Sequence, residues 1–301
     1  MNAIKLAVPL FIPKRSMKMN VKKLAILKKL AIPLFVALAY GPAQGLAMPV
    51  LGSELASFAV LGASAVTNTG ATTLTGNLGI SPGSAITGAE SITLTGVTHA
   101  TDAFASLAQS QLASARTSLG LMGSGTTLAN FDLSGLTLTP GVYTVPAGTS
   151  NLTGTLTLDG QNNANAAWVF QMPSTLITSP GSVVNVINTG SGAGLFWDVG
   201  SSATLDTTTS FAGNILALAS ITLNNGATMG CGGALVNTAA VTMAMNTIGI
   251  GCGGGLTVSE LGGTPAFLPF VPVPEPETYA MLLAGLGLMG FVARRRKQNA
   301  A

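Results

Sequence analysis

The sequence predicts a mainly β protein, a β-solenoid with three strands per coil and one long α-helix packed alongside. Three observations predict this fold. The 301 residues include 38 glycines and 35 threonines but only 8% charged residues, and threonine with β-branched neighbours favours strands. Similar segments recur about every twenty residues, which is typical of a solenoid. One stretch, residues 101–122, instead has the apolar spacing of a helix.

The repeat is clearest in four eleven-residue segments, which begin at Ala167, Leu195, Gly213 and Gly233, at spacings of 28, 18 and 20 residues. Each contains an apolar strand, a corner of small residues and a second strand in which threonine alternates with apolar residues. A third short strand follows the last three segments. Because side chains alternate between the two sides of a strand, we expect its apolar residue to point inward and the preceding residue outward. The inward residues are Phe211, Met229 and Ile248, and the outward residues are Ser210, Thr228 and Thr247.

The N-terminal part supplies a similar coil at 58–61, 66–68 and 73–77. A helix predicted at about 101–122 separates this coil from the later ones, with Thr101 as the expected N-cap and Arg116 expected on its solvent side. Its apolar residues fall three or four apart and form one face that must pack against the solenoid. These residues are Phe104, Ala108, Leu112, Ala115, Leu119 and Met122.

The charge distribution excludes several classes of function for the body of the chain. Twelve of the 13 basic residues lie before position 30 or at 294–297, so residues 48–273 carry eight acidic residues and one basic residue, Arg116. A nucleic-acid partner is therefore not expected. The acidic residues Asp159, Asp198 and Asp206 are expected at corners or strand ends, where they serve turns.

The sequence also lacks the residue sets that catalysis requires. No HExxH or calcium-binding nonapeptide motif is present, and the single histidine, His99, stands without a catalytic partner in sequence. A polysaccharide lyase or hydrolase would need clustered carboxylates, or a base and a cation. We therefore expect no enzymatic activity, no cofactor and no metal.

The N-terminal residues have the pattern of a secretory signal peptide. Four lysines at 22, 23, 28 and 29 precede a short apolar run, residues 30–40, and small residues follow up to Ala47. We expect residues 1–47 to form the signal peptide, with cleavage after Ala47. An uncleaved anchor is the alternative, although the apolar run is short for a membrane span.

The C-terminal residues have three parts. The sequence Pro274-Glu275-Pro276 precedes an apolar span at 279–293, and four cations follow at 294–297. This order predicts a transmembrane helix whose basic end lies in the cytoplasm. The tail, residues 274–301, resembles the PEP-CTERM sorting signal of Gram-negative bacteria. The resemblance implies recognition by an exosortase, transient anchoring in the inner membrane, removal of the tail and delivery to the cell surface or the extracellular space; a plain anchor is the alternative.

The remaining residues are expected to form one folded domain at 48–260 and a Pro/Gly-containing linker at 261–273. Several of the domain's segments resemble the microbial ice-binding-like family. They are Ser57–Ala63, Thr67–Gly70, Gly76–Gly83, Leu138–Tyr143, Phe196–Ser202 and Gly213–Ala217. The resemblance implies a discontinuous right-handed β-solenoid in which the N-terminal strands pack between later coils, with a long helix parallel to the stack.

The only two cysteines, Cys231 and Cys252, lie 21 residues apart, which is about one coil. This spacing would place them on neighbouring turns and permit a disulfide in an oxidising compartment. Closing such a loop would contribute about 3 kcal/mol to stability.

Threonine columns are the remaining candidate for function. Parallel strands lie about 4.8 Å apart and alternate residues of one strand about 6.6–7 Å apart, so outward threonines form a nearly rectangular lattice with spacings close to those of ice. The sequence offers one column on the third strands and one on the second, and we favour the third because its small neighbours keep it flat. The third-strand set is Thr73, Thr75, Ser210, Thr228 and Thr247, and the second-strand set is Thr204, Thr222 and Thr242.

These features predict an exported ice-binding protein that adsorbs to ice and inhibits its growth or recrystallisation. Its expected partners are the ice surface and, for the tail, an exosortase. Threonine is common on any exposed strand. The alternative is therefore an extracellular matrix or adhesion module that binds exopolysaccharide or protein on the same scaffold.

Overall fold

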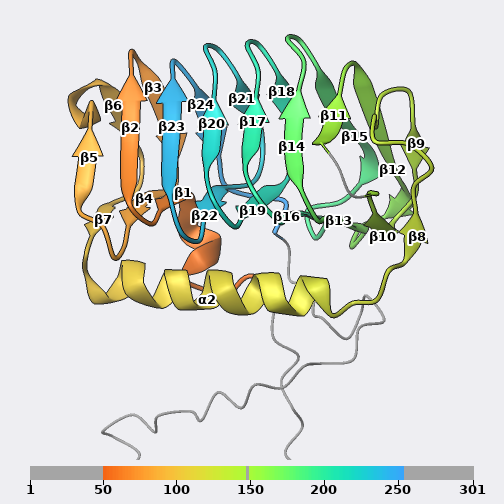
Figure 1. Ribbon diagram of the computed structural model, residues 1–301, viewed down its shortest axis with the longest axis horizontal. Helices are drawn as coiled ribbons and strands as arrows, with labels where there is room; N and C mark the ends of the chain where they lie inside the picture. The colour runs from red at the N-terminus through yellow and green to blue at the C-terminus, as the bar shows by residue number, and fades with distance from the viewer. Residues whose placement is uncertain (1–49, 147–148, 254–301) are drawn as a thin grey trace, which may run out of the picture. The chain divides into compact units, whose positions relative to one another are not determined.

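The computed structural model describes residues 50–146 and 149–253, which form three parallel β-sheets and one α-helix (Figure 1). The predicted signal peptide, linker and tail, including the expected span at 279–293, lie outside the described residues. Within the described residues, no helix is long and apolar enough to cross a membrane.

Each sheet collects one strand from each coil. The first-strand sheet contains, in spatial order, β10 (Gly141–Thr144), β13 (Ala167–Met172), β16 (Gly194–Val199), β19 (Asn214–Ala217), β22 (Ala234–Val236), β1 (Phe58–Gly62), β4 (Asn77–Ile80) and β7 (Thr98–Ala100). The second-strand sheet contains β11 (Thr149–Leu152), β14 (Thr175–Thr178), β17 (Ala203–Leu205), β20 (Ile221–Leu223), β23 (Ala240–Ala244), β2 (Ala65–Thr69) and β5 (Ala85–Thr87). The third-strand sheet contains β6 (Ile92–Leu94), β3 (Thr72–Thr75), β24 (Thr247–Gly249), β21 (Thr228–Met229), β18 (Ser210–Phe211), β15 (Val183–Thr189), β12 (Thr155–Asn163) and β9 (Thr137–Leu138). The short strand β8 (Thr126–Thr127) and two 3₁₀-helices, η1 (Leu55–Ser57) and η2 (Ala89–Ser91), complete the elements.

The core lies between the three sheets, where inward side chains of successive coils stack. The ring centroids of Phe170 and Trp197 are 4.1 Å apart, and Phe211 lies 5.0 Å beyond Trp197. Met229 and Ile248 are fully buried and pair in register, so the inward positions predicted for the third strands are confirmed. Strict alternation along each strand therefore fixes which residues face solvent.

The first-strand sheet is buried on both sides, because the helix α2 (Ala103–Gly120) covers its outer face. Leu112 and Leu119 of this helix are fully buried in a cluster with Phe196 and Leu235 of the sheet. The predicted apolar face is thus confirmed. Double-sided burial explains the nearly continuous apolar sequence of these strands.

The predicted N-cap of the helix is wrong by one residue. Asp102 is the N-cap, and its carboxylate accepts a hydrogen bond from the backbone N–H of Ala105 at 2.8 Å. Thr101 instead takes a positive φ of 57° and forms the turn that leads from β7 into the helix. A carboxylate at the N-terminus also complements the helix dipole.

The stacking order differs from the sequence order, as the family resemblance implied. β1, β2 and β3 pair with β22, β23 and β24, so the N-terminal coils continue the stack beyond the last coil. They do not pack between later coils, and that detail of the expectation is wrong. In Figure 1 the orange strands β2 and β5 accordingly follow the blue strand β23.

This order explains the long helix. The chain must return from β7, at one end of the first-strand sheet, to β10 at the other end. Seven strand spacings cover about 34 Å. The 18-residue helix spans about 27 Å of this distance, and the residues flanking it cover the rest.

The predicted alignment of the repeats is wrong at two steps of the first-strand sheet. Leu195 pairs with Trp168 rather than with Ala167. Ala234 pairs with Ile215 rather than with Asn214. Each of these steps is therefore one residue shorter than expected.

Candidate functional site

Two sheets present an open outer face. The helix covers the first-strand sheet, whereas the outward side chains of the second-strand and third-strand sheets are exposed or half-buried. The candidate site is therefore one of these two faces.

The third-strand face carries most of the predicted set in one column. Ser210 pairs with Thr228, Thr228 with Thr247, and Thr247 with Thr73. Thr75 lies in the next column, opposite Gly249. Thr73, Thr75, Ser210 and Thr247 are exposed, while Thr228 is half-buried and its hydroxyl donates to the backbone oxygen of Thr209 at 3.4 Å. The structure thus brings four of the five residues into one line.

The second-strand face carries a longer threonine column than the sequence suggested. The predicted Thr204, Thr222 and Thr242 pair in register, and Thr67 and Thr87 extend the column by two coils. Beyond Thr204 the column continues with Ile177, which is 39% exposed. We call these five threonines the second-strand column. All five are exposed or half-buried, and the structure gives none of their hydroxyls a hydrogen-bond partner among the described residues.

Thr67 and Thr87 were missed, although the sequence carries a signal for them. Each threonine of the second-strand column follows a small residue and an inward apolar residue. The five triplets are Ala65-Val66-Thr67, Ala85-Ile86-Thr87, Ser202-Ala203-Thr204, Ser220-Ile221-Thr222 and Ala240-Val241-Thr242. The same triplet also occurs at Ser91-Ile92-Thr93 on the third-strand sheet, so it identifies the threonines but does not show which of them stack in one column.

The first residues of these triplets form a second column of small side chains. Ala65 pairs with both Ala240 and Ala85, and the hydroxyls of Ser202 and Ser220 lie 3.0 Å apart. Because serine and alanine are short, they do not rise above the threonines. The second-strand face is therefore a flat array of methyl and hydroxyl groups on fixed strand spacings.

One carboxylate borders this face. Asp206 lies directly after β17, and its Oδ1 accepts hydrogen bonds from the side-chain amide of Asn224 at 2.9 Å and from the backbone N–H of Thr207 at 2.7 Å. The bond from Asn224, followed by that from Thr207, lowers the pKa of Asp206 below its ordinary value. As predicted, this aspartate serves a strand end.

The expectations for Arg116 and Asp198 are wrong. Asp198 lies inside β16 and points outward beneath the helix, where Arg116 meets it with Nε 3.0 Å from Oδ1. The guanidinium also donates to the backbone oxygens of Leu216 and Val199. Both side chains are about 15% exposed. A carboxylate buried under the helix needs a cationic partner. Arg116 is this partner, and its side chain therefore does not face solvent.

His99 has a structural environment. Its Nδ1 lies 2.7 Å from Oδ2 of Asp102, and its ring stacks on Phe104 with centroids 4.4 Å apart. The histidine thus packs at the helix entrance and orients the N-cap carboxylate.

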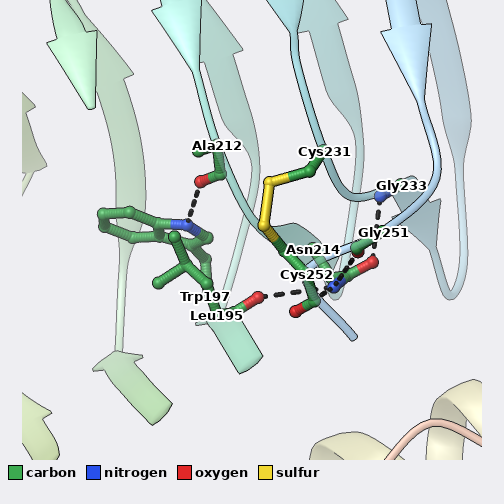
Figure 2. Close-up of a disulfide and its surroundings, with 8 residues drawn as sticks. All are labelled: Leu195, Trp197, Ala212, Asn214, Cys231, Gly233, Gly251 and Cys252. Atoms are coloured by element: carbon green, nitrogen blue, oxygen red, sulfur yellow. Dashed lines mark hydrogen bonds between the residues drawn. A yellow bond between two sulfur atoms is a disulfide. The ribbon is translucent and has the colours of Figure 1, made fainter. Parts of the chain in front are cut away.

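A disulfide joins Cys231 and Cys252, with Cα atoms 5.4 Å apart (Figure 2). This is the pairing expected from the spacing of about one coil, and it lies at the corner between the third-strand and first-strand sheets. The buried side chain of Asn214 lies beside it and hydrogen-bonds to the backbone around it.

The fold and its two open faces define a β-solenoid that presents flat arrays of small hydroxyl side chains. The chain belongs to the ice-binding-like family, whose sequence model matches residues 60–249. A second match, to the PEP-CTERM protein-sorting motif, covers residues 272–297.

Individual relatives agree with this assignment. The chain is 40% identical to an ice-binding protein of Nostoc sp. (strain HG1), over 84% of this chain and 90% of the relative. It is 29% identical to an ice-binding protein of Colwellia sp., over 73% of this chain and 92% of the relative.

Among solved structures, an ice-binding protein from an Antarctic biological consortium matches with a TM-score of 0.63 and 38% identity, over 67% of this chain and 91% of that one. An ice-binding protein of the ascomycete Antarctomyces psychrotrophicus matches with a TM-score of 0.63 and 33% identity, over 67% of this chain and 97% of that one.

Proposed function

We propose that this chain is an ice-binding protein that adsorbs to ice and inhibits its growth or recrystallisation. Family membership and the similarity to ice-binding proteins over most of their length support the proposal. The observation that carries it is the second-strand column, five threonines in register beside a column of serine and alanine. The proposal assigns no catalysis to the chain.

The chemistry of threonine suits such a surface. Its branched side chain is stiff at χ1, so the array is ordered before it meets ice. The methyl group excludes water, whereas the hydroxyl can hold one water molecule in place. Each contact is weak, and adsorption results from many contacts that the strand spacing holds in register. Because little conformational entropy is lost on binding, a rigid flat face is favoured.

The geometry supports the second-strand face better than the third-strand face. Its column holds five consecutive threonines, whereas the third-strand column holds four before Ser210, namely Thr93, Thr73, Thr247 and Thr228. Its strands β2 and β23 have five residues each, whereas β18 and β21 have two. The adjacent column contains side chains on the second-strand face but Gly230 and Gly249 on the third-strand face. The third-strand set of Thr73, Thr75, Ser210, Thr228 and Thr247, which the sequence favoured, is the second candidate, because four of its members share a column.

A pair of matched substitutions distinguishes the faces. Thr222 and Thr228 are both half-buried outward residues near the middle of their sheets. Tyrosine at either site would raise a protrusion that holds a flat face away from ice. We expect Thr222→Tyr to abolish most ice shaping and thermal hysteresis, and Thr228→Tyr to leave them nearly unchanged, with circular dichroism showing that both variants fold.

The reverse result would assign binding to the third-strand face. If both folded variants keep full activity, neither column contacts ice and the proposed site is wrong.

The same proposal includes export. The match to the PEP-CTERM motif supports delivery to the cell surface or beyond, through transient inner-membrane anchoring by residues 279–293 and removal of the tail by an exosortase. Mass spectrometry of the secreted protein tests this step. The mature form should lack the four cations at 294–297, and a secreted form that retains them would contradict processing.

A further inference from the structure

The stack contains one junction where neighbouring coils are far apart in sequence. There β22, β23 and β24 of the last coil pair with β1, β2 and β3 of the first. Among the described residues, no corner of the chain leads from one of these two coils into the other, so they are held together by noncovalent contacts. The pair Thr242–Thr67 of the second-strand column lies at this junction.

Gln109 of helix α2 spans the junction from the outside. Its side-chain nitrogen donates to the backbone oxygens of Gly62 and Val236, each at 3.0 Å. Gly62 is the last residue of β1 and Val236 the last of β22, and they directly follow the paired residues Leu61 and Leu235. Because both neighbours are carbonyl oxygens, only the nitrogen of the amide can face them. One side chain thus contacts both coils at equivalent positions, and we call this contact the outer bridge.

Arg116 makes the same kind of contact further along the helix. It donates to the backbone oxygens of Leu216 in β19 and Val199 in β16. In the first-strand sheet, the pair β16–β19 lies two strand spacings, about 9.6 Å, from the pair β22–β1. Positions 109 and 116 are about 10.5 Å apart along the helix axis. The helix therefore matches the spacing of the coils, and Gln109 occupies the position over the junction.

A buried network spans the same junction at the corner between the second-strand and third-strand sheets. Thr72 Oγ1 of the first coil accepts a hydrogen bond from Asn246 N of the last coil at 3.1 Å and donates to Asn68 Oδ1 at 2.6 Å. The side chains of Thr72 and Asn246 are both fully buried. The amide of Asn246 continues into the preceding coil, where it donates to the backbone oxygens of Asn224 and Ala227 at 2.9 Å each. We call the contact between Thr72 and Asn246 the inner bridge.

The two bridges lie at opposite ends of the strand pair β2–β23. The outer bridge precedes these strands in the chain and the inner bridge follows them, so the pair Thr242–Thr67 lies between the bridges. Within the second-strand column, this pair joins the two threonines of the N-terminal coils to the three of the later coils. Both bridges therefore act on the link that makes the column continuous.

We propose that Gln109 and Thr72 are positioning residues for the second-strand column, which they hold in register across the junction. The proposal rests on the proposed function of that column. Neither residue contacts ice, because Gln109 is half-buried between helix and sheet and Thr72 is buried in the core. When a bridge is removed, the junction opens more often than the other pairs of coils, and five threonines act as arrays of two and three. Adsorption needs many weak contacts at once, so ice binding falls more than overall stability.

The variant Gln109→Leu tests the outer bridge. Leucine is similar in size to glutamine but has no hydrogen-bond donor. The backbone oxygen of Gly62 keeps a hydrogen bond from Ser81 N at 3.2 Å, so the substitution mainly removes the link across the junction. Hydrogen exchange of the full chain in mild detergent, resolved to single amides, measures the effect, and circular dichroism checks that the variant folds.

Gln171→Leu is the matched control. Gln171 also joins the helix to the first-strand sheet, since its side-chain nitrogen donates to Leu119 O at 2.7 Å. It lies in β13, however, away from the junction. The control variant therefore loses the same kind of contact between the same helix and sheet without affecting the pairing of the first and last coils.

In Gln109→Leu we expect about tenfold faster exchange at amides that bond across the junction, which is the factor that the loss of one or two hydrogen bonds gives. Amides that bond across later coils should change less than about twofold. The junction amides are those of Ala63, Ser64 and Thr73, and the later-coil amides are those of Leu176 and Ala203. Thermal hysteresis should fall below about half of the wild-type value, because a divided array loses simultaneous contacts. Gln171→Leu should leave the junction amides and the hysteresis unchanged.

Thr72→Val tests the inner bridge independently. Valine has nearly the same shape as threonine but lacks the hydroxyl that accepts from Asn246 N. We expect faster exchange at the amides of Thr73 and Asn246 and the same loss of hysteresis. This variant also decides the question if Gln109→Leu does not fold.

Selective acceleration at the junction together with reduced hysteresis supports the positioning role. Equal acceleration at all amides would overturn it, because the bridges would then contribute only to global stability. Unchanged junction amides, or selective acceleration with full hysteresis, would overturn it too. If the wild type itself does not shape ice, the proposed function fails and the positioning role fails with it, whereas the exchange comparison still shows whether the bridges hold the junction.

Discussion

At the scale of single residues, burial and a neighbouring positive charge have opposite effects on the pKa of Asp198. Burial beneath the helix raises the pKa of its carboxyl group, while the charge and hydrogen bond of Arg116 act in the opposite direction. A carboxylate can occupy this buried position only because Arg116 forms an ion pair with it. A buried ion pair adds little stability over apolar residues, but removing one partner leaves an uncompensated charge.

We therefore predict that Arg116→Met lowers the free energy of unfolding by about 2–4 kcal/mol at pH 7. The double variant Arg116→Met/Asp198→Asn should recover part of the loss. Urea denaturation measures both, and a single variant as stable as the wild type would show that the pair contributes nothing.

The pH dependence of this loss has a defined sign. A carboxyl group whose pKa is raised by folding binds its proton more tightly in the folded state, so its contribution to stability is present at low pH and lost as the pH rises through the raised pKa. Without Arg116 the opposing effect is gone and the pKa of Asp198 rises further. The destabilisation by Arg116→Met should thus be larger at pH 7 than at pH 4; the opposite trend would contradict the assignment.

At the scale of elements, helix α2 closes the outer face of the first-strand sheet and returns the chain along the stack. Leu112 is fully buried between helix and sheet, whereas Leu107 of the same helix is 43% exposed. The two leucines are a matched pair that differs in burial alone.

Leu112→Ala should lower the free energy of unfolding by about 2–5 kcal/mol, since it removes buried methyl groups and leaves a cavity. Leu107→Ala should change it by less than about 0.5 kcal/mol, as exposed substitutions usually do. Denaturant titration of both variants checks this; similar losses at the two sites would mean that the helix does not pack as described.

The same helix shows which elements the sequence alone can predict. Its apolar spacing depends on neighbours three and four residues apart, so its position and buried face were predictable. The pairing of Arg116 with Asp198, 82 residues away, depends on which strand lies beneath the helix, and periodicity carries no such information. For this reason the predicted solvent-facing position of Arg116 was wrong.

The threonine columns show the same division between local and long-range information. Thr228 and Met229 occupy the outward and inward positions that alternation predicts. Thr67 and Thr87 join Thr242 only because the first coils stack on the last one, and this depends on pairing between residues about 175 positions apart. The length of the second-strand column was therefore not predictable from the later repeats alone.

At the scale of the whole molecule, both threonine columns depend on the junction between the last coil and the first. The pairs Thr242–Thr67 and Thr247–Thr73 lie at this junction, so each column is continuous only where β23 meets β2 and β24 meets β3.

Ice-affinity partitioning of purified residues 48–273 shows directly whether the second-strand face binds ice. The protein is held with a slowly growing ice surface, and its fraction in the ice and in the liquid is measured for the wild type and for Thr222→Tyr. We predict that the wild type is concentrated in the ice and that the folded Thr222→Tyr variant stays in the liquid. A wild-type protein that folds yet is excluded from the ice would contradict ice binding and favour a matrix or adhesion role for this surface.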